Sequence, residues 1–380
     1  MGLYLSIHTM KIILAPDKFR GSLTARQAAK AMAEGAQLAL PHADLIQFPL
    51  ADGGEGTAHI LTSATRGSWH TVEVQDPLGR PVEAGYGLAG DGKTAFIDMA
   101  TASGLDRLSR EERNPVKTST YGTGQLISRA METGVRHIIL GLGGSATTDA
   151  GIGMAAALGW QFLDATDQPL PPTGENLIHL ARLVPPAESI VEDVWFSVAC
   201  DVLNPLYGPD GAAYVYGPQK GATPEQVAQL DGGLRNFARV ISEQFGYELG
   251  DMPGAGAAGG LGAGCLFFLQ AGLRPGIELI LESIDFDQHL SDARLVLTGE
   301  GKLDEQTAQG KLLHGLTDRA GEVPVVALCG AVELAPEAIQ AIGLRAAFSI
   351  QTKPQSVDAA LKTAFDDLRA ATFNVCRLFS

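Results

Sequence analysis

Positive charge is scarce in this chain, and its scarcity excludes a class of partner. The 380 residues include 28 Lys and Arg against 43 Asp and Glu, which gives a formal net charge of -15. Nucleic acids are polyanions that require clustered Lys and Arg, and no basic stripe occurs in the sequence. We therefore expect no nucleic-acid partner.

Cysteine and long apolar runs are also scarce. The four cysteines, Cys200, Cys265, Cys329 and Cys376, are far apart and lack the paired spacing of metal ligands. They are typical of small core residues in a reduced compartment.

No apolar run reaches membrane-spanning length, and residues 1–9 lack the features of a signal peptide. We expect a cytoplasmic protein with no membrane partner, and we exclude residues 1–9 from the fold prediction.

Several signatures of catalysis are missing as well. The Gly-x-x-x-x-Gly-Lys-Ser/Thr phosphate loop is absent, and the scattered histidines form no His-x-x-His pair. Ser145 has no evident His and Asp partners. These absences disfavour an ordinary P-loop kinase, a zinc hydrolase and a serine hydrolase.

Short β-rich segments alternate with helical patterns along most of the chain. A first strand is expected at residues 11–15, where Pro16 stops it, and Thr24 opens a capping box before a helix. Further strands are expected at residues 45–48, 137–140, 194–199, 295–298, 324–329 and 346–350. The alternation predicts an α/β fold with a parallel sheet and helices on both faces.

Two stretches interrupt this alternation. Residues 69–99 contain hairpin-like turns, and residues 204–264 are rich in Gly and Pro. We predict that they form a second, inserted domain, and within it the Gly- and Ala-rich residues 253–264 are a candidate hinge or lid. The predicted boundaries are 10–65, 115–195 and 285–380 for the first domain, and 66–114 with 196–284 for the inserted one.

Glycine, carboxylate, hydroxyl and lysine residues collect directly after the expected strands. Ligands of open parallel sheets bind at the carboxyl ends of the strands, so these segments are candidate binding loops. They are PDKFRGS (16–22), ADGGEGT (51–57), GLGGSATTDAG (141–151), CD (200–201) and TGEGKLDEQTAQGK (298–311).

The third of these loops lies between an expected strand and an expected helix. Its residues Gly143, Gly144, Ser145 and Thr147 are candidates for binding phosphate, because free amides and the dipole at a helix N-terminus attract anions. A tight turn with one capping hydroxyl is the structural alternative.

A dinucleotide-binding interpretation competes with this one. Residues 141–146 match the Gly-x-Gly-x-x-Gly/Ala fingerprint, and Asp164 follows at roughly the expected distance. An NAD(P)-dependent dehydrogenase is therefore an alternative. Against it, the fingerprint normally opens the first β–α unit of a domain, whereas several strands precede it here.

The remaining candidates are charged. Asp201 follows an apolar strand and is a candidate for base catalysis or metal binding, with a turn cap as the alternative. Glu300 and Asp304 lie in a loop of mixed charge, as expected where a metal nucleotide is held. Lys18 and Arg20 could neutralise a phosphate or a substrate carboxylate. In the second loop, a small ligand can approach the backbone of Gly53 and Gly54. The carboxylates of Asp52 and Glu55 can accept hydrogen bonds from its hydroxyls.

Taken together and in order, these motifs resemble the bacterial type I glycerate kinase family. The resemblance runs from Met10 to near the C-terminus. It rests on APDKFRGSLTA, ADGGEGT, GLGGSATTDAGIGMAAALG, CDVLNPLYGPDGAAYVYGPQKGA, PGAGAAGGLGAG and LTGEGKLDEQTAQGK. It implies a Rossmann-like parallel-sheet domain, a second, inserted α/β domain and an interdomain cleft.

The resemblance also implies an activity, which is ATP-dependent phosphorylation of D-glycerate, usually at the 2-hydroxyl, within glyoxylate or sugar-acid metabolism. ATP and Mg²⁺ are the implied cofactors, D-glycerate is the small-molecule partner, and a homo-oligomer is allowed. A kinase of another small hydroxy acid and a non-catalytic sensor of small acids remain as alternatives.

Site roles follow as a hypothesis on this resemblance. ATP phosphates are assigned to Gly143, Gly144, Ser145 and Thr147, with Glu300 and Asp304 nearby. Glycerate is assigned to Asp52, Gly53, Gly54, Glu55 and Arg20. Catalysis is assigned to Asp201, as base or magnesium ligand, and to Lys18.

Overall fold

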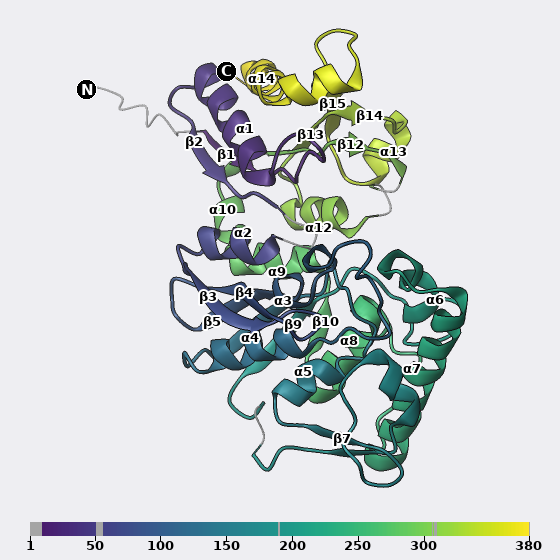
Figure 1. Ribbon diagram of the computed structural model, residues 1–380. Helices are drawn as coiled ribbons and strands as arrows, with labels where there is room; N and C mark the ends of the chain where they lie inside the picture. The colour runs from purple at the N-terminus through teal and green to yellow at the C-terminus, as the bar shows by residue number, and fades with distance from the viewer. Residues whose placement is uncertain (1–9, 51–55, 189–190, 306, 308–309, 380) are drawn as a thin grey trace, which may run out of the picture. The chain divides into compact units, whose positions relative to one another are not determined.

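The computed structural model describes residues 10–50, 56–188, 191–305, 307 and 310–379. Contacts within the backbone divide the chain into two compact units (Figure 1). Unit 1 combines the two ends of the chain, Met1–Asp52 and Ile280–Ser380, and unit 2 is the continuous segment Gly53–Leu279 between them. One unit is therefore inserted into the other.

Unit 1 contains a parallel five-stranded sheet in the order β15-β13-β11-β1-β2. Its strands are β1 (Lys11–Leu14), β2 (Asp44–Gln47), β11 (Ala293–Thr298), β13 (Val325–Cys329) and β15 (Ala346–Ser349), with the short pair β12 (Lys302–Leu303) and β14 (Ala331–Val332) beside them. Its helices are α1 (Ala25–Ala39), α10 (Phe286–Leu290), α12 (Lys311–Ala320), α13 (Pro336–Ala341), α14 (Val357–Cys376) and the 3-10 turn η4 (Arg377–Phe379).

Strand β1 lies between β11 and β2 in this sheet, and the topology reverses beside it. From β1 the chain runs through α1 to β2 on one side, and after unit 2 it returns to place β11 on the other side. Ile12, Ile13 and Leu14 are fully buried, as expected for a strand covered on both faces. The carboxyl ends of β1 and β11 thus form the topological switch point, where open α/β sheets bind ligands.

Helices α1 and α14 lie side by side along this sheet (Figure 1). The capping box predicted at Thr24 is confirmed, because its side chain accepts a hydrogen bond from Gln27 N and the Gln27 side chain accepts one from Thr24 N. A Cβ atom at Gly35 would lie 2.2 Å from the carbonyl oxygen of Arg369. The close packing of the two helices therefore requires glycine at this position.

Unit 2 contains a mixed six-stranded sheet in the order β10-β9-β6-β5-β4-β3. The strands are β3 (Ser68–Gln75), β4 (Pro81–Leu88), β5 (Thr94–Asp98), β6 (His137–Gly141), β9 (Trp195–Ala199) and β10 (Gly272–Arg274), with a separate pair β7 (Gln161–Leu163) and β8 (Arg182–Val184). The strands β3, β4 and β5 are antiparallel, which confirms the hairpins expected at residues 69–99, and β5, β6, β9 and β10 are parallel.

The helical elements of unit 2 connect these strands. They are α2 (Thr57–Ala64), α3 (Ala100–Ser103), η1 (Leu105–Arg107), α4 (Tyr121–Met131), α5 (Ile152–Ala157), η2 (Gly174–His179), α6 (Ala212–Tyr216), η3 (Pro218–Lys220), α7 (Pro224–Phe245) and α8 (Ala257–Phe268). Helix α9 (Gly276–Ser283) contains the boundary between unit 2 and unit 1. None of the described helices combines the length and apolar character needed to cross a membrane.

The unit boundaries differ from those predicted. Residues 115–195 were expected beside the first strand, but they lie in unit 2, because β6 pairs in parallel with β5 and β9. Both units alternate strands with helices, so the alternation alone does not show to which sheet a strand belongs.

The candidate hinge or lid at residues 253–264 needs a correction too. Most of it is buried within unit 2, and Gly259 and Gly260 have positive φ angles of 71° and 88° at a kink in α8. A Cβ atom at Gly259 would lie 2.0 Å from the carbonyl oxygen of Thr147. This segment is a close-packed wall behind the 141–151 loop, and not an exposed lid.

Candidate functional site

Two carboxylates stand at the switch point of unit 1. Asp17 follows β1 and Glu300 follows β11, and the two strand ends are tied together. The Thr298 hydroxyl donates to the Ala15 carbonyl at 2.8 Å, and Asp17 N donates to the Gly299 carbonyl at 2.8 Å. The parallel pairing of β1 with β11 therefore holds residues from opposite ends of the chain together.

A third carboxylate joins them through a shared threonine. The Thr307 hydroxyl lies 3.3 Å from Glu300 Oε2 and 3.5 Å from Asp304 Oδ1, and Thr307 N donates to Asp304 Oδ1 at 3.2 Å. Lys302 Nζ lies 3.3 Å from Asp304 Oδ2 and 2.9 Å from Glu333 Oε2. We call Asp17, Glu300 and Asp304 the acidic cluster.

In the acidic cluster, the pKa of Glu300 is raised. Burial, together with the negative charges of Asp17 and Asp304, raises the pKa of Glu300 to about 7, against the Thr307 hydrogen bond and the positive charge of Arg20. A carboxyl group that titrates near neutral pH can accept or donate a proton under physiological conditions. Glu300 is therefore the strongest acid–base candidate in unit 1.

The basic candidates of unit 1 occupy the loop after β1. Lys18 N donates to the Asp17 carboxylate at 2.7 Å, and Phe19 N donates to the Leu23 carbonyl at 2.8 Å, so the loop is closed on itself. Arg20 is exposed, and its charge acts on Glu300. The structure thus brings Lys18, Arg20 and the acidic cluster to one edge of the sheet.

In unit 2, the predicted phosphate-binding residues differ in how accessible they are. Gly144 is exposed, with a φ angle of 76°, and Gly143 is half-buried. Ser145 and Thr147 are buried, and Thr147 has no exposed surface. The Gly144 carbonyl accepts a hydrogen bond from Leu105 N at 2.8 Å, which holds the loop against its neighbour. Only the two glycines therefore present surface to a ligand.

The helix after this loop is already capped by the chain's own carboxylate. Asp149 accepts hydrogen bonds from Gly151 N at 3.1 Å and from Gly153 N at 3.3 Å, at the start of α5. It also accepts from Thr120 N at 2.7 Å and from the Thr120 hydroxyl at 2.8 Å. Burial raises the pKa of Asp149, and these four hydrogen bonds oppose the rise. The first amides of α5 thus already have partners within the chain, because Gly153 N donates to Asp149 and Met154 N donates to the Thr120 hydroxyl at 2.8 Å.

A buried lysine supports the same loop, and sequence reasoning missed it. Lys220 is 2% exposed, and its Nζ donates to Ser145 Oγ at 2.7 Å and to the Thr147 carbonyl at 2.6 Å. Burial lowers the pKa of Lys220 to about 7, against the attraction of Asp149. Within the described residues, the buried hydroxyls of Thr147 and Thr148 make no hydrogen bond. The only sequence signal for Lys220 is its place in the irregular segment GPQKGA.

The predicted catalytic carboxylate of unit 2 has a structural partner. Asp201 follows β9 and is half-buried, and its Oδ1 accepts a hydrogen bond from Gly276 N, the first residue of α9, at 3.2 Å. A carboxylate at a helix N-terminus is electrostatically favourable. Among the residues that the structure describes, no group of three or more His, Cys, Asp or Glu side chains is arranged to hold a metal ion.

Four predicted substrate-binding positions lie outside the described residues, namely Asp52, Gly53, Gly54 and Glu55. The helix that follows them, α2, is capped from elsewhere. Asp98 accepts hydrogen bonds from Gly56 N at 2.8 Å and from Ala58 N at 3.1 Å. A buried carboxylate at the end of β5 therefore satisfies the amides at the start of α2.

The dinucleotide alternative loses its physical basis. Residues 142–151 separate β6 from α5, so no helix opens directly after the glycines. The Asp164 carboxylate accepts hydrogen bonds from Thr166 N at 2.7 Å and from Gln168 N at 2.9 Å, within its own turn. The glycine pattern alone does not support an NAD(P) site.

Comparison with known proteins decides the family. The model of the glycerate kinase family matches residues 12–380. The chain belongs to the glycerate kinase family. Members of this family are kinases, so this chain is an enzyme, as the sequence resemblance predicts.

The relatives of this glycerate kinase family member match it along nearly its whole length. A glycerate kinase of Halalkalibacterium halodurans is 47% identical over 96% of this chain and 97% of its own. A glycerate 2-kinase of Escherichia coli K12 is 40% identical over 96% of this chain and 97% of its own. A crystal structure described as glycerate kinase 2 from Salmonella typhimurium LT2 has a TM-score of 0.88 at 42% identity and covers 98% of each chain. The α/β fold is thus that of a solved relative.

Proposed function

We propose that this enzyme transfers the γ-phosphoryl group of ATP to the 2-hydroxyl of D-glycerate, which yields 2-phosphoglycerate and ADP. Membership of the family supports the kinase reaction, and the name of the Escherichia coli relative supports the 2-position. The observation that carries the proposal is Glu300, a partly buried carboxyl group with a pKa of about 7 at the switch point of a parallel sheet.

Phosphoryl transfer depends on positioning and on charge neutralisation. The glycerate 2-hydroxyl oxygen forms a bond to the γ-phosphorus, the bond from that phosphorus to the β–γ bridging oxygen breaks, and the hydroxyl proton passes to the Glu300 carboxylate. Lys18 and Arg20 offset the negative charge of the phosphoryl group and of the glycerate carboxylate. Asp304 is paired with Lys302 and bonded to Thr307, and so it positions the loop that carries Glu300.

In unit 2, residues 141–151 are proposed to form a phosphate-facing loop. Gly143 and Gly144 present their backbone to the ATP phosphates, while Ser145 and Thr147 act from behind through their bonds to Lys220. Because the first amides of α5 already donate to Asp149 and Thr120, we assign the positive charge for phosphate binding to Lys220, and not to a helix dipole. Residues 52–55 keep their proposed role in binding glycerate.

Asp201 is proposed to hold the magnesium ion of Mg-ATP. Mg²⁺ prefers oxygen ligands and is usually bound by one or two carboxylates together with substrate phosphates and water. The single carboxylate of Asp201 fits this donor set, and its bond to Gly276 N holds it in position. When bound with ATP, Mg²⁺ neutralises charge on the phosphates. The base role considered for Asp201 passes to Glu300, whose pKa lies nearer neutrality.

The proposal is tested by incubating the protein with D-glycerate, MgCl₂ and ATP and by identifying the product with phosphorus NMR. A 2-phosphoglycerate signal is expected. A 3-phosphoglycerate signal would contradict the proposed position of transfer. Absence of any phosphoglycerate from folded protein would overturn glycerate as substrate, and other small hydroxy acids would then be assayed in the same way.

Replacing Asp201 by Asn tests the metal role. The amide oxygen can still accept from Gly276 N, so the fold should persist, but the charge is lost. We expect the Mg²⁺ concentration that gives half-maximal rate to rise roughly tenfold, corresponding to about 1.4 kcal/mol of binding free energy. The rate is measured as a function of Mg²⁺ at saturating ATP and glycerate. Asp210→Asn, at an exposed position, is the control. If the rate of Asp201→Asn depends on Mg²⁺ as that of the wild type does, Asp201 is not a magnesium ligand.

A further inference from the structure

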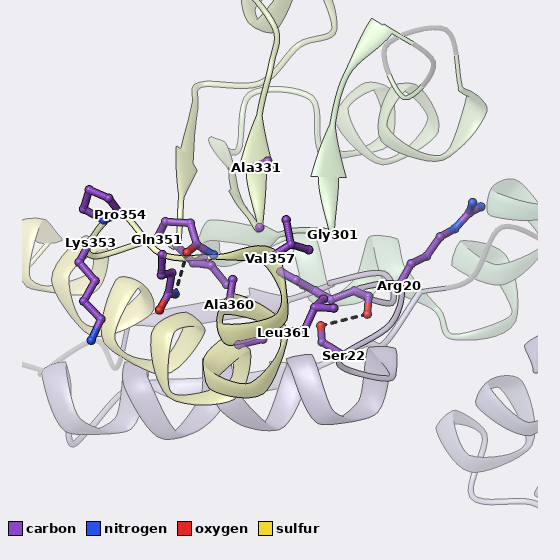
Figure 2. A pocket seen from close by; sticks show the side chains of 15 residues that line it. Arg20, Ser22, Gly301, Ala331, Gln351, Lys353, Pro354, Val357, Ala360 and Leu361 are labelled. Atoms are coloured by element: carbon purple, nitrogen blue, oxygen red, sulfur yellow. Dashed lines mark hydrogen bonds between the residues drawn. The ribbon is translucent and has the colours of Figure 1, made fainter.

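A cavity of about 370 Å³ opens in unit 1, next to the carboxyl ends of several strands (Figure 2). One wall is the loop after β1, a second comes from Gly301 and Ala331, and a third comes from the segment after β15 and the first turns of α14. It thus lies at the edge of the sheet where a ligand of an open α/β fold binds.

The interior of the cavity is apolar and uncharged. Ala331, Val357, Ala360 and Leu361 line it, and Figure 2 shows the three residues of α14 along one side. Val357 is 75% exposed and Leu361 is 38% exposed, which leaves apolar surface uncovered at the cavity. This surface fits a flat apolar ring better than it fits an anion.

The charged residues of the lining point elsewhere. In Figure 2, the side chains of Arg20 and Lys353 extend away from the cavity in opposite directions. The polar side chains that remain are those of Ser22, Gln351 and Gln355. The Ser22 hydroxyl donates to the Phe19 carbonyl at 3.2 Å, and Gln355 Nε2 donates to Gln351 Oε1 at 2.8 Å. Glutamine amides can pair with the hydrogen-bonding edge of adenine.

The backbone that lines the cavity is connected to the acidic cluster. Gly301 follows Glu300 in the chain, and Gly330 N donates to the Glu300 carbonyl at 3.0 Å. A Cβ atom at Gly330 would lie 2.4 Å from the Gly301 carbonyl oxygen, so this wall is built from backbone in close contact. Arg20 lines the cavity, and Glu300 directly precedes the lining residue Gly301, so the cavity lies next to these two charged residues in the fold.

We propose that this cavity binds the adenine and ribose of ATP, and this inference rests on the proposed role of ATP as phosphoryl donor. Glycerate is a small polar anion and would leave the apolar walls unfilled, whereas a nucleoside suits a pocket of this size and composition. The phosphates then extend toward Arg20 and the acidic cluster, where the proposed proton acceptor stands.

Filling the cavity tests the proposal. Ala360→Trp places a large ring in the lining, and Ala359→Trp, at the neighbouring half-buried position that does not line the cavity, is the matched control. We expect Ala360→Trp to raise the KM for ATP at least tenfold with less than a twofold change in the KM for D-glycerate, and Ala359→Trp to change neither. Circular dichroism confirms that both variants are folded. A KM for ATP that is unchanged in folded Ala360→Trp would overturn the inference.

Binding without turnover separates this inference from the proposed function. Adenosine and ADP are titrated onto the wild-type protein and onto Ala360→Trp by calorimetry and saturation-transfer NMR. Binding to the wild type that is lost in the variant supports the cavity even if no phosphoglycerate is formed. An active wild type whose ADP affinity is the same in Ala360→Trp refutes the cavity and leaves the kinase reaction intact. If Ala360→Trp does not fold, Gln351→Leu takes its place, with an expected tenfold loss of ADP affinity, and unchanged affinity would count against the proposal.

Discussion

Glu300→Gln is expected to lower kcat/KM by a factor on the order of 100 or more at neutral pH, which is the usual contribution of a general base. Gln keeps the size of the side chain and its oxygen can still accept from Thr307, but it cannot take up a proton. The loss should appear in kcat as well, because the proton is transferred during the chemical step.

The pH profile distinguishes this role from a structural one. The pKa of Glu300 is about 7, so the carboxylate is converted to its neutral form as the pH falls through 7. The kcat/KM of the wild type should therefore decrease below about pH 7, and the low residual rate of Glu300→Gln should lack that decrease. Initial rates from pH 5.5 to 9 in a coupled ADP assay measure both.

The thermal stability of Glu300→Gln provides an independent test of the raised pKa of Glu300. The folded state raises the pKa of Glu300 from 4.5 to about 7, so the stability that this group contributes falls as the pH rises between these values, and the full penalty persists above pH 7. Glu300→Gln removes this penalty, so the variant should melt at a higher temperature than the wild type at pH 8 while being less active. The exposed Glu322→Gln serves as control and should change neither property. Wild-type kcat/KM in Glu300→Gln would exclude Glu300 as the proton acceptor.

Lys220→Met is expected to destabilise unit 2 by about 3 kcal/mol, as removal of one partner from a buried charged network usually does. Methionine retains the apolar stem of the side chain, but the Ser145 hydroxyl and the Thr147 carbonyl lose their ammonium donor. Asp149 also loses its nearest positive charge. Urea denaturation at pH 7 measures the change, and the exposed Lys117→Met is the control.

The pH dependence of this difference has a definite sign. The pKa of Lys220 is lowered from 10.5 to about 7 in the folded protein, so between these values the unfolded chain binds the extra proton. The stability contributed by this residue rises with pH in that interval. The difference in unfolding free energy between wild type and Lys220→Met should therefore grow between pH 7 and 10. A difference that does not vary with pH would show that Lys220 is not the buried, weakly basic amine described above.

The positions of the loops could be predicted from the sequence, but their partners could not. Apolar periodicity located β1, β6, β9 and β11, and each is followed by a polar loop as predicted. The raised pKa of Glu300 results from burial and then from the charge of Asp17, which comes from the other end of the chain through the pairing of β1 with β11. A local pattern carries no information on such long-range pairing.

The glycine loop illustrates the same limit. A strand, glycines and a helix predict free helix amides, but the loop's own Asp149 folds back on them. Lys220 reaches Ser145 from 75 residues away, and its segment has neither periodicity nor a known spacing to reveal it. The four cysteines, whose burial follows from composition alone, are all buried as predicted.

The insertion of unit 2 between the two parts of unit 1 sets an order for folding during synthesis. When β1 and β2 leave the ribosome, the other neighbour of β1 has not yet been made, and its fully buried Ile12, Ile13 and Leu14 have no sheet to join. Unit 2 is continuous and can fold first, since domains generally fold as units as they emerge. Asp17 and Glu300 meet only after β11 is translated, so no chain that ends before Glu300 contains the proposed proton-accepting site. The proposed site is therefore incomplete until 300 of the 380 residues have been synthesised.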